Sequence, residues 1–410
     1  MKYAYLTCEL LGRDLDSRLL IASHLIKRGV SCVVGQQWSM VANAANCPAG
    51  VFLFKTTNLI QGHFARQAKA SGHKVVMSDE EVLAVQDEAE IRCITSPVSL
   101  GHADVFLAMD ERHKRIAREI HPDVPIEVIG NARVELLRDH SEIYRDEVRR
   151  IQEAGPYILF NTSFCTTNSV WGDVTNALDV IYRVRGMDPH DEATHAFGRE
   201  CVAFERANRE ITTGLMGWAT ASGRRVVVRP HPAERPETWQ DLPGVEVVAK
   251  TNPIPWLMGA DAMVHASSTT GLEAALLGAP CLNINPLKDC MFGKMYVTDD
   301  VNVTVRSLES AKVALQALLV NSSGVMSRAN YRAPAYLPAW PTGGAEKTAD
   351  AISKLAPDSP AMSRWVGLAR APTQINKFQI GGWDFAQKAG QLTDAKVRQI
   401  DDSLFLMEAA

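Results

Sequence analysis

The chain alternates strand-length apolar runs with helix-length amphipathic segments, and this alternation constrains its fold more than any other feature. At the start, "YAYLTCEL" leads into "LDSRLLIASHLIKRG", whose apolar residues fall at helical spacing. Five more apolar runs follow ("SCVVG", "GVFLFK", "HKVVMS", "DVFLAM" and "IEVIG"), with helical stretches around 58–71, 111–120 and 141–154. Because strands that alternate with helices build parallel sheets, residues 1–153 are predicted to form a Rossmann-like, doubly wound domain.

A second series of the same kind begins after Gly155 and Pro156. "YILFN" is followed by a helical stretch over 192–222 and then by the runs "RRVVVRP", "VEVVAK", "DAMVHA" and "CLNINP". The expected fold class is therefore α/β, with a second Rossmann-like domain over 154–355 that faces the first across a cleft. Residues 356–410 show no strand pattern, and we expect them to pack back across the cleft or to form a tail.

Composition narrows the class of protein. The 410 residues carry a net charge of −4, so there is no global basic field of the kind that binds nucleic acid. No stretch approaches the roughly 18 apolar residues of a membrane span, and charge precedes any long apolar run at the N-terminus. The eight cysteines are scattered without a C-x-x-C pair, which is typical of reduced thiols. We expect a cytoplasmic enzyme or binding protein, with peripheral membrane contact at the inner face as an option.

The stretch "RRVVVRPHPAERPETW" predicts a binding loop. Val226–Val228 form a β-branched run that ends at Arg229, and His231 stands between Pro230 and Pro232. Proline fixes its own φ and restricts the residue before it, so the backbone around His231 is stiff. In open α/β sheets ligands bind at the carboxyl ends of the strands. Arg229 and His231 are candidate phosphate ligands there, and a solvated histidine on a rigid loop is the alternative.

A second candidate element is "DAMVHASSTTGLEAALLGAP". It predicts a strand, a turn of four hydroxyl residues at 267–270, and a helix that Gly278 and Pro280 end. Hydroxyls and unpaired N–H groups at a helix start favour anions, so Ser267, Ser268, Thr269 and Thr270 are candidate phosphate ligands. Glu273 is a candidate acceptor for a ribose hydroxyl. An ordinary N-cap at Ser268 or Thr270, and a capping-box or helix-dipole role for Glu273, are the alternatives.

Carboxylates stand out in the first half. Asp79, Glu80 and Glu81 follow the strand "HKVVMS", either as a helix start or with one member facing the cleft as general base or nucleophile. Asp14 and Asp16 have the D-x-D spacing of a metal–nucleotide clamp, but a cap at Asp16 explains them as well. We predict no metal and no cofactor. No G-x-G-x-x-G follows the first strand, and there is no P-loop, H-E-x-x-H or G-x-S-x-G.

Over roughly residues 1–330 these segments resemble the family of surface carbohydrate biosynthesis proteins. The resemblance rests on "RDLDSRLLIASHLIKRGVSCVVG", "SDEEVL", "VIGNARVELL", "YILFNTSF", "VVRPHPAE" and "SSTTGLEAALLGAPCLNINP". It implies a two-domain GT-B glycosyltransferase fold and similarity to bacterial transferases that use Kdo or sialic acid linked to CMP. The acidic motif of those enzymes matches Asp79 and Glu80, the His-Pro motif matches His231 and Pro232, and the serine motif matches Ser267 and Ser268. Two positions depart from the pattern: Val82 follows the acids where glycine is usual, and Ala132 replaces a common proline.

The resemblance implies that His231 and the serines hold the CMP phosphate and that an acidic-motif residue transfers a proton or acts as nucleophile. Glu80 is the expected catalytic carboxylate ahead of Asp79. The expected function is a metal-independent glycosyltransferase of capsule or lipopolysaccharide, which uses a nucleotide-sugar donor and a glycan or lipid-linked acceptor. A nucleotide-sugar 2-epimerase, a CDP-alcohol phosphotransferase and a non-catalytic assembly protein are the alternatives.

Overall fold

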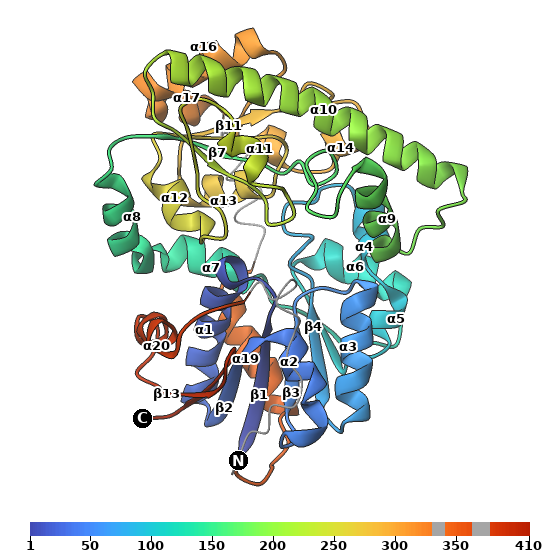
Figure 1. Ribbon diagram of the computed structural model, residues 1–410. Coiled ribbons are helices and arrows are strands. Elements are labelled where there is room, and N and C mark those ends of the chain that lie inside the picture. Colours follow the sequence, from blue (N-terminus) through green and yellow to red (C-terminus); the bar gives the residue numbers. More distant parts are fainter. Residues whose placement is uncertain (330–340, 363–377) are drawn as a thin grey trace. The chain divides into compact units, whose positions relative to one another are not determined.

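The computed structural model describes residues 1–329, 341–362 and 378–410 (Figure 1). The described chain forms two compact units. Unit 1 comprises Met1–Leu83, Ile91–His140 and the described part of Trp340–Ala410, and unit 2 comprises Ala84–Glu90 and the described part of Ser141–Ala339. Each unit is built on its own sheet.

Unit 1 contains an eight-stranded sheet in the order β13-β14-β2-β1-β3-β4-β5-β6. The six strands from β2 to β6 in this order pair in parallel, and the hairpin of β13 and β14 adds to β2 in antiparallel orientation. The strands are β1 (Lys2–Cys8), β2 (Val30–Gln36), β3 (Val51–Phe54), β4 (Lys74–Ser78), β5 (Val105–Ala108), β6 (Ile126–Val128), β13 (Lys396–Asp401) and β14 (Leu404–Glu408).

The helices of unit 1 cover a sheet that is apolar on both faces, as central parallel strands require. One face packs an aromatic cluster in which the rings of Tyr5 and Phe52 stack with centroids 4.7 Å apart. The helices are α1 (Leu11–Lys27), α2 (Gln37–Ala42), α3 (Leu59–Ala70), α5 (Pro97–Leu100), α6 (Glu111–Ile120), α7 (Ala132–Asp139), α19 (Gly344–Leu355) and α20 (Gly382–Gly390), with a 3-10 turn at Ala44–Asn46; α4 (Glu88–Ile94) begins in unit 2 and ends in unit 1.

Unit 2 contains a six-stranded, all-parallel sheet in the order β12-β11-β10-β7-β8-β9. Its strands are β7 (Ile158–Asn161), β8 (Val226–Arg229), β9 (Val245–Val247), β10 (Ala262–His265), β11 (Cys281–Ile284) and β12 (Val303–Val305). Its helices are α8 (Arg145–Gln152), α9 (Val174–Arg185), α10 (Glu192–Ala221), α11 (Glu237–Gln240), α12 (Pro253–Gly259), α13 (Thr270–Leu277), α14 (Met291–Lys294), α15 (Thr298–Val301), α16 (Leu308–Val320) and α17 (Ser322–Ala329), with a 3-10 turn at Ser141–Tyr144.

These elements confirm the predicted α/β class with two parallel-dominated sheets. Every apolar run named above forms a strand, and the stretch expected to be helical over 192–222 is α10. The acids at 79–81 are not a helix start, because a turn over 81–84 follows β4 and the next helix begins at Glu88.

The ends of the units differ from the predicted domain limits. Residues 141–153, expected in the first domain, belong to unit 2, where α8 packs on α12. α19, expected in the second domain, belongs to unit 1 and packs on α1 and α7. The chain therefore returns from unit 2 to unit 1 before α19. Local sequence pattern does not predict such a crossing.

The C-terminal segment corrects the expectation of no strand after 356. β14 pairs with β2 so that Phe405 lies opposite Val34, and the ring of Phe405 stacks on Phe385 with centroids 3.9 Å apart. Gly35 permits this pairing, since an added Cβ would lie 2.0 Å from the carbonyl oxygen of Ser403. The hairpin extends the sheet of unit 1 beyond its parallel strands.

Candidate functional site

Polar side chains form a row across the carboxyl end of the sheet in unit 2. Arg229 lies opposite Asn161, Asn161 opposite His265, and His265 opposite Asn283. Residues in register on parallel strands point to the same face of the sheet. The strand ends therefore place four polar groups side by side at the edge where α/β proteins bind ligands.

Asn161 connects the two sequence-predicted halves of this site. Its Oδ1 accepts a hydrogen bond from Arg229 Nη1 at 3.3 Å, and its Nδ2 donates to Thr270 Oγ1 at 3.0 Å. Arg229 also donates from Nη2 to the carbonyl oxygen of Thr251 at 2.7 Å. The structure thus brings Arg229 and Thr270 to one place, and Asn161 is the residue that the sequence analysis missed.

His231 is exposed on its loop and has a defined proton position. Its Nδ1 accepts from the N–H of Ala233 at 3.1 Å and lies 3.1 Å from Cys165 Sγ. Because an N–H already points at Nδ1, the proton of the neutral ring belongs on Nε2. His231 can therefore present an Nε2–H donor to a ligand.

The carboxylate of Glu234 holds the His-Pro loop through hydrogen bonds. It is buried, and it accepts from the backbone N–H of His231 at 3.0 Å, from Thr162 Oγ1 at 2.9 Å and from Trp239 Nε1 at 3.1 Å. Burial raises the pKa of Glu234, although these donors oppose that change. The prolines and Glu234 together account for the rigid loop that the sequence predicted.

The serine motif forms a tight turn. Ser267 has a φ of 45°, and its N–H donates to Asn283 Oδ1 at 2.8 Å. The residue is only 6% exposed, yet its buried Oγ has no hydrogen-bond partner within the described chain. A buried hydroxyl without a partner costs free energy, so this atom is a candidate ligand contact.

His265 supports the turn as a neutral ring. Its Nδ1 accepts from the N–H of Ser268 at 3.1 Å, and its Nε2 lies 3.1 Å from Asn302 Oδ1. Burial lowers the pKa of His265 to about 4, so the ring stays uncharged at neutral pH. Gly271 allows this close approach, because a Cβ there would lie 2.5 Å from the ring.

The first turn of α13 differs from expectation in one respect. The N–H groups of Gly271, Leu272 and Glu273 all donate to the carbonyl oxygens of Ser268 or Thr269 and are not unpaired. Ser268 Oγ accepts from Thr270 Oγ1 at 3.0 Å, and the N-cap residue Thr269 makes no side-chain cap bond. What remains for an anion is the hydroxyl cluster and the positive end of the helix dipole.

In unit 1, Asp79 is committed to holding loops together. It is buried, and its Oδ2 accepts from Thr57 Oγ1 at 2.6 Å and from the Thr57 N–H at 3.0 Å, while its Oδ1 accepts from the Glu81 N–H at 3.1 Å. Burial raises the pKa of Asp79 to about 7, against the opposing effect of these donors. Its hydrogen bonds leave Asp79 poorly placed to accept a proton from a substrate.

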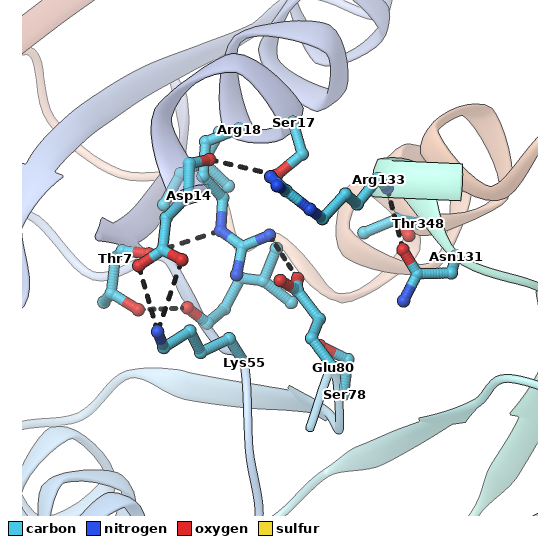
Figure 2. A network of polar contacts seen from close by, with 12 residues as sticks. Thr7, Asp14, Ser17, Arg18, Lys55, Ser78, Glu80, Asn131, Arg133 and Thr348 are labelled. Carbon is cyan, nitrogen blue, oxygen red and sulfur yellow. Dashed lines mark hydrogen bonds and ion pairs between the residues drawn. The ribbon is translucent and has the colours of Figure 1, made fainter. Parts of the chain in front are cut away.

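Glu80 pairs with a buried arginine. Arg18 donates from Nη1 to Glu80 Oε1 at 2.7 Å and from Nε to the carbonyl oxygen of Thr7 at 3.2 Å (Figure 2). Glu80 Oε2 and Arg18 Nη2 are buried and have no hydrogen-bond partner within the described residues. Of the two acids, Glu80 is the one with an oxygen left for another group.

Asp14 and Lys55 form the centre of this network. Lys55 Nζ lies 3.1 Å and 3.2 Å from the two oxygens of Asp14, and both side chains are at most 1% exposed (Figure 2). Asp14 also accepts from the N–H groups of Glu9 and Leu10, which precede the helix. The N-cap of α1 is Leu10, without a side-chain cap bond, so Asp16 is not the cap that the sequence suggested. Asp16 lies 3.6 Å from Lys388 Nζ. The D-x-D pair is thus occupied by lysines and backbone.

No cluster of three or more histidine, cysteine or acidic side chains within the described chain could hold a metal ion. No helix there is both long and apolar enough to cross a bilayer.

Comparison with known proteins supports the fold. No protein-family model matches the chain, and no curated protein matches it. The UDP-GlcNAc 2-epimerase of Methanocaldococcus jannaschii, solved with UDP-GlcNAc and UDP, is similar at a TM-score of 0.52 and 13% identity, over 86% of this chain and 100% of that one. The wall teichoic acid polymerase TagF is similar at a TM-score of 0.51 and 12% identity, over 86% of this chain and 88% of that one. The chain is therefore an α/β protein of GT-B-like two-domain fold.

Proposed function

We propose that the chain is a glycosyltransferase that binds a nucleotide-sugar donor at the carboxyl edge of the sheet in unit 2. The observation that carries this proposal is the joined polar group of Arg229, Asn161 and Thr270, beside the buried and unpartnered Ser267 Oγ. A guanidinium, several hydroxyls and a helix start are the groups that proteins use to bind phosphate. The fold likeness to an enzyme solved with UDP-GlcNAc and UDP supports a nucleotide sugar as the ligand.

Each residue of the site has a role in this proposal. Arg229 and the positive end of α13 neutralise the phosphate charge, and His231 donates its Nε2–H to a phosphate oxygen as the nucleotide leaves. Ser267, Ser268 and Thr269 supply hydroxyls, and Glu273 accepts from the ribose. The resemblance of the His-Pro and serine motifs favours CMP as the nucleotide and Kdo or a related acid sugar as the transferred group.

The reaction would take place in the synthesis of a bacterial surface polysaccharide, such as capsule or lipopolysaccharide. The acceptor would be a glycan or a lipid-linked glycan, reached from the cytoplasmic side of the membrane. The 2-epimerase and the CDP-alcohol phosphotransferase remain competing functions, since the two solved structures above are an epimerase and a teichoic acid polymerase.

Incubation with CMP-, UDP- and CDP-linked donors, with and without an acceptor glycan, distinguishes these functions. A glycosyltransferase releases nucleotide and extends the acceptor only when both substrates are present. An epimerase converts the donor with no acceptor, and a phosphotransferase leaves a phosphodiester in the product. A chain that binds nucleotide but converts none of the donors would be an assembly protein.

Replacement of His231 by alanine should weaken nucleotide binding by about 1.5–3 kcal/mol, the range for hydrogen bonds to charged groups. Calorimetry with cytidine and uridine nucleotides measures the change. His195→Ala is the matched control, because His195 is an exposed histidine on α10 of the same unit. Equal affinity of both variants and of the unchanged chain for every nucleotide would refute the role of His231.

Turnover should persist in excess chelator. In the proposed site the counter-charge for the donor comes from Arg229 and the start of α13, while Asp14 is held by Lys55. The measurement is nucleotide release with and without EDTA. Loss of activity that magnesium or manganese restores would show that a metal takes part.

A further inference from the structure

A cavity of about 440 Å³ lies in unit 2 on one side of α10. Arg206, Arg209, Glu210 and Thr213 come from one face of this helix, at the i, i+3, i+4 and i+7 spacing. Thr167 and Val174 complete the lining. Ligand pockets commonly have about 300–1,000 Å³, so the volume suits a ligand of saccharide size.

The charges in the cavity are available to a ligand. Arg206 is exposed, and neither Arg206 nor Glu210 makes a hydrogen bond or an ion pair with the described residues. Arg209 makes one hydrogen bond with the described residues, from its Nη1 to the backbone oxygen of Thr167 at 3.2 Å. Two guanidiniums against one carboxylate leave a net positive charge.

The walls of the cavity are fixed before any ligand binds. The buried carboxylate of Glu205 accepts from the N–H groups of Thr166 and Thr167 at 3.0 Å and 2.7 Å. The guanidinium of Arg209 lies over the ring of Trp239, with 5.5 Å between its Cζ and the ring centroid. Pre-positioned groups reduce the entropy lost on binding.

The same contacts connect the cavity to the His-Pro loop. Trp239 donates to Glu234, which holds the backbone of His231. Cys165, two residues before Thr167, lies 3.1 Å from the His231 ring. The cavity is therefore linked to the His-Pro loop through Arg209, Trp239 and Glu234.

We propose that this cavity binds the anionic group of a hydroxyl-rich saccharide. The arginines would bind a carboxylate or phosphate, and Glu210, Thr167 and Thr213 would accept from or donate to hydroxyls. The saccharide is the sugar of the donor or a unit of the acceptor, since both carry this chemistry. The inference rests on the proposed function, for which it specifies an acidic saccharide substrate.

The test measures binding of glucuronic acid, glucose 6-phosphate and glucose to the full chain by saturation-transfer NMR. The two anions should bind and glucose should not.

Arg206→Gln should weaken binding of the anions about 10-fold or more, as expected for loss of a charged hydrogen bond. Thr213→Val is a second variant, which keeps the charge of the cavity. It should weaken binding of both anionic sugars and leave glucose the weaker ligand. Arg199→Gln, the same change at an exposed residue of α10 outside the cavity, should have no effect.

A comparison of UDP-glucuronic acid with UDP-glucose identifies the source. If the saccharide belongs to the donor, Arg206→Gln removes a preference for UDP-glucuronic acid and leaves binding of UDP unchanged. If it belongs to the acceptor, Arg206→Gln leaves both donors unchanged and weakens only the free anionic sugars. Equal binding of glucose and glucuronic acid, or no effect of Arg206→Gln on any of them, would overturn the inference. If the unchanged chain binds neither UDP nor CMP, the proposed donor site is refuted instead.

Discussion

Replacement of Lys55 by methionine should lower the free energy of unfolding by about 3–5 kcal/mol, the cost of removing one partner of a buried ion pair. Lys55 lies 3.1 Å from an oxygen of Asp14, and both are buried in unit 1 (Figure 2). Methionine fills a similar volume but removes the buried ammonium, so that the partly exposed Arg13, whose Nε lies 3.3 Å from Asp14 Oδ1, is the ion-pair partner left to the carboxylate. Chemical denaturation of the full chain measures the change.

A matched control and a pH series separate this effect from loss of an ordinary surface pair. Lys74→Met breaks an ion pair with Asp104 in which Lys74 is 51% exposed, so it should cost about 1 kcal/mol or less. Burial alone would raise the pKa of Asp14, but the charges of Lys55, Arg13 and Arg18, together with the N–H donor of Leu10, outweigh burial and hold that pKa below its ordinary value. The stabilisation is thus complete above about pH 4 and is lost as the pH falls. A Lys55→Met variant as stable as Lys74→Met would contradict the account.

Replacement of Glu80 by glutamine should reduce turnover by about 10²-fold or more, the effect of losing a general base. Glu80 has a carboxylate oxygen with no partner in the described residues, whereas the oxygens of Asp79 are occupied. Glutamine keeps the size and one acceptor but removes the basicity. Because the proposed donor site lies in unit 2, nucleotide affinity should stay nearly unchanged, and single-turnover kinetics measures the rate.

Asp79→Asn is the matched variant, and we expect it to stay active. Because burial raises the pKa of Asp79 to about 7, this group is already partly neutral, and an amide oxygen can still accept from Thr57. An inactive Asp79→Asn with a fully active Glu80→Gln would move the catalytic role to Asp79. Two active variants would show that the acidic motif only fixes loops.

Local pattern was enough to predict the sheets. The run Val226–Val228 ends at Arg229 as β8 does, and the 192–222 periodicity gives α10, because both depend on neighbours in sequence. The C-terminal hairpin was missed for the opposite reason. β14 pairs with β2 as well as with β13, and its partners in β2 are more than 360 residues away in the chain.

The positions of the motif residues could be predicted, because Arg229, His231 and Ser267 lie at or just beyond the carboxyl ends of strands. Their role in binding stays a prediction, and the groups that contact them could not be predicted. Asn161, Arg18 and Lys55 carry no local signal, because polar residues at strand ends and in amphipathic helices are usually solvated. Their importance comes from contacts such as that between Arg18 and Glu80, which are 62 positions apart.

Hydrogen–deuterium exchange of the chain with and without CMP locates the bound nucleotide and so tests whether the donor site lies in unit 2. We expect slower exchange in the His-Pro loop at 229–234 and in the serine turn and start of α13 at 267–273, with no change in β1 and α1 of unit 1. The same experiment on His231→Ala at equal CMP should show weaker protection at both places. Protection confined to unit 1, or none in unit 2 at saturating CMP, CDP and UDP, would contradict the proposed donor site.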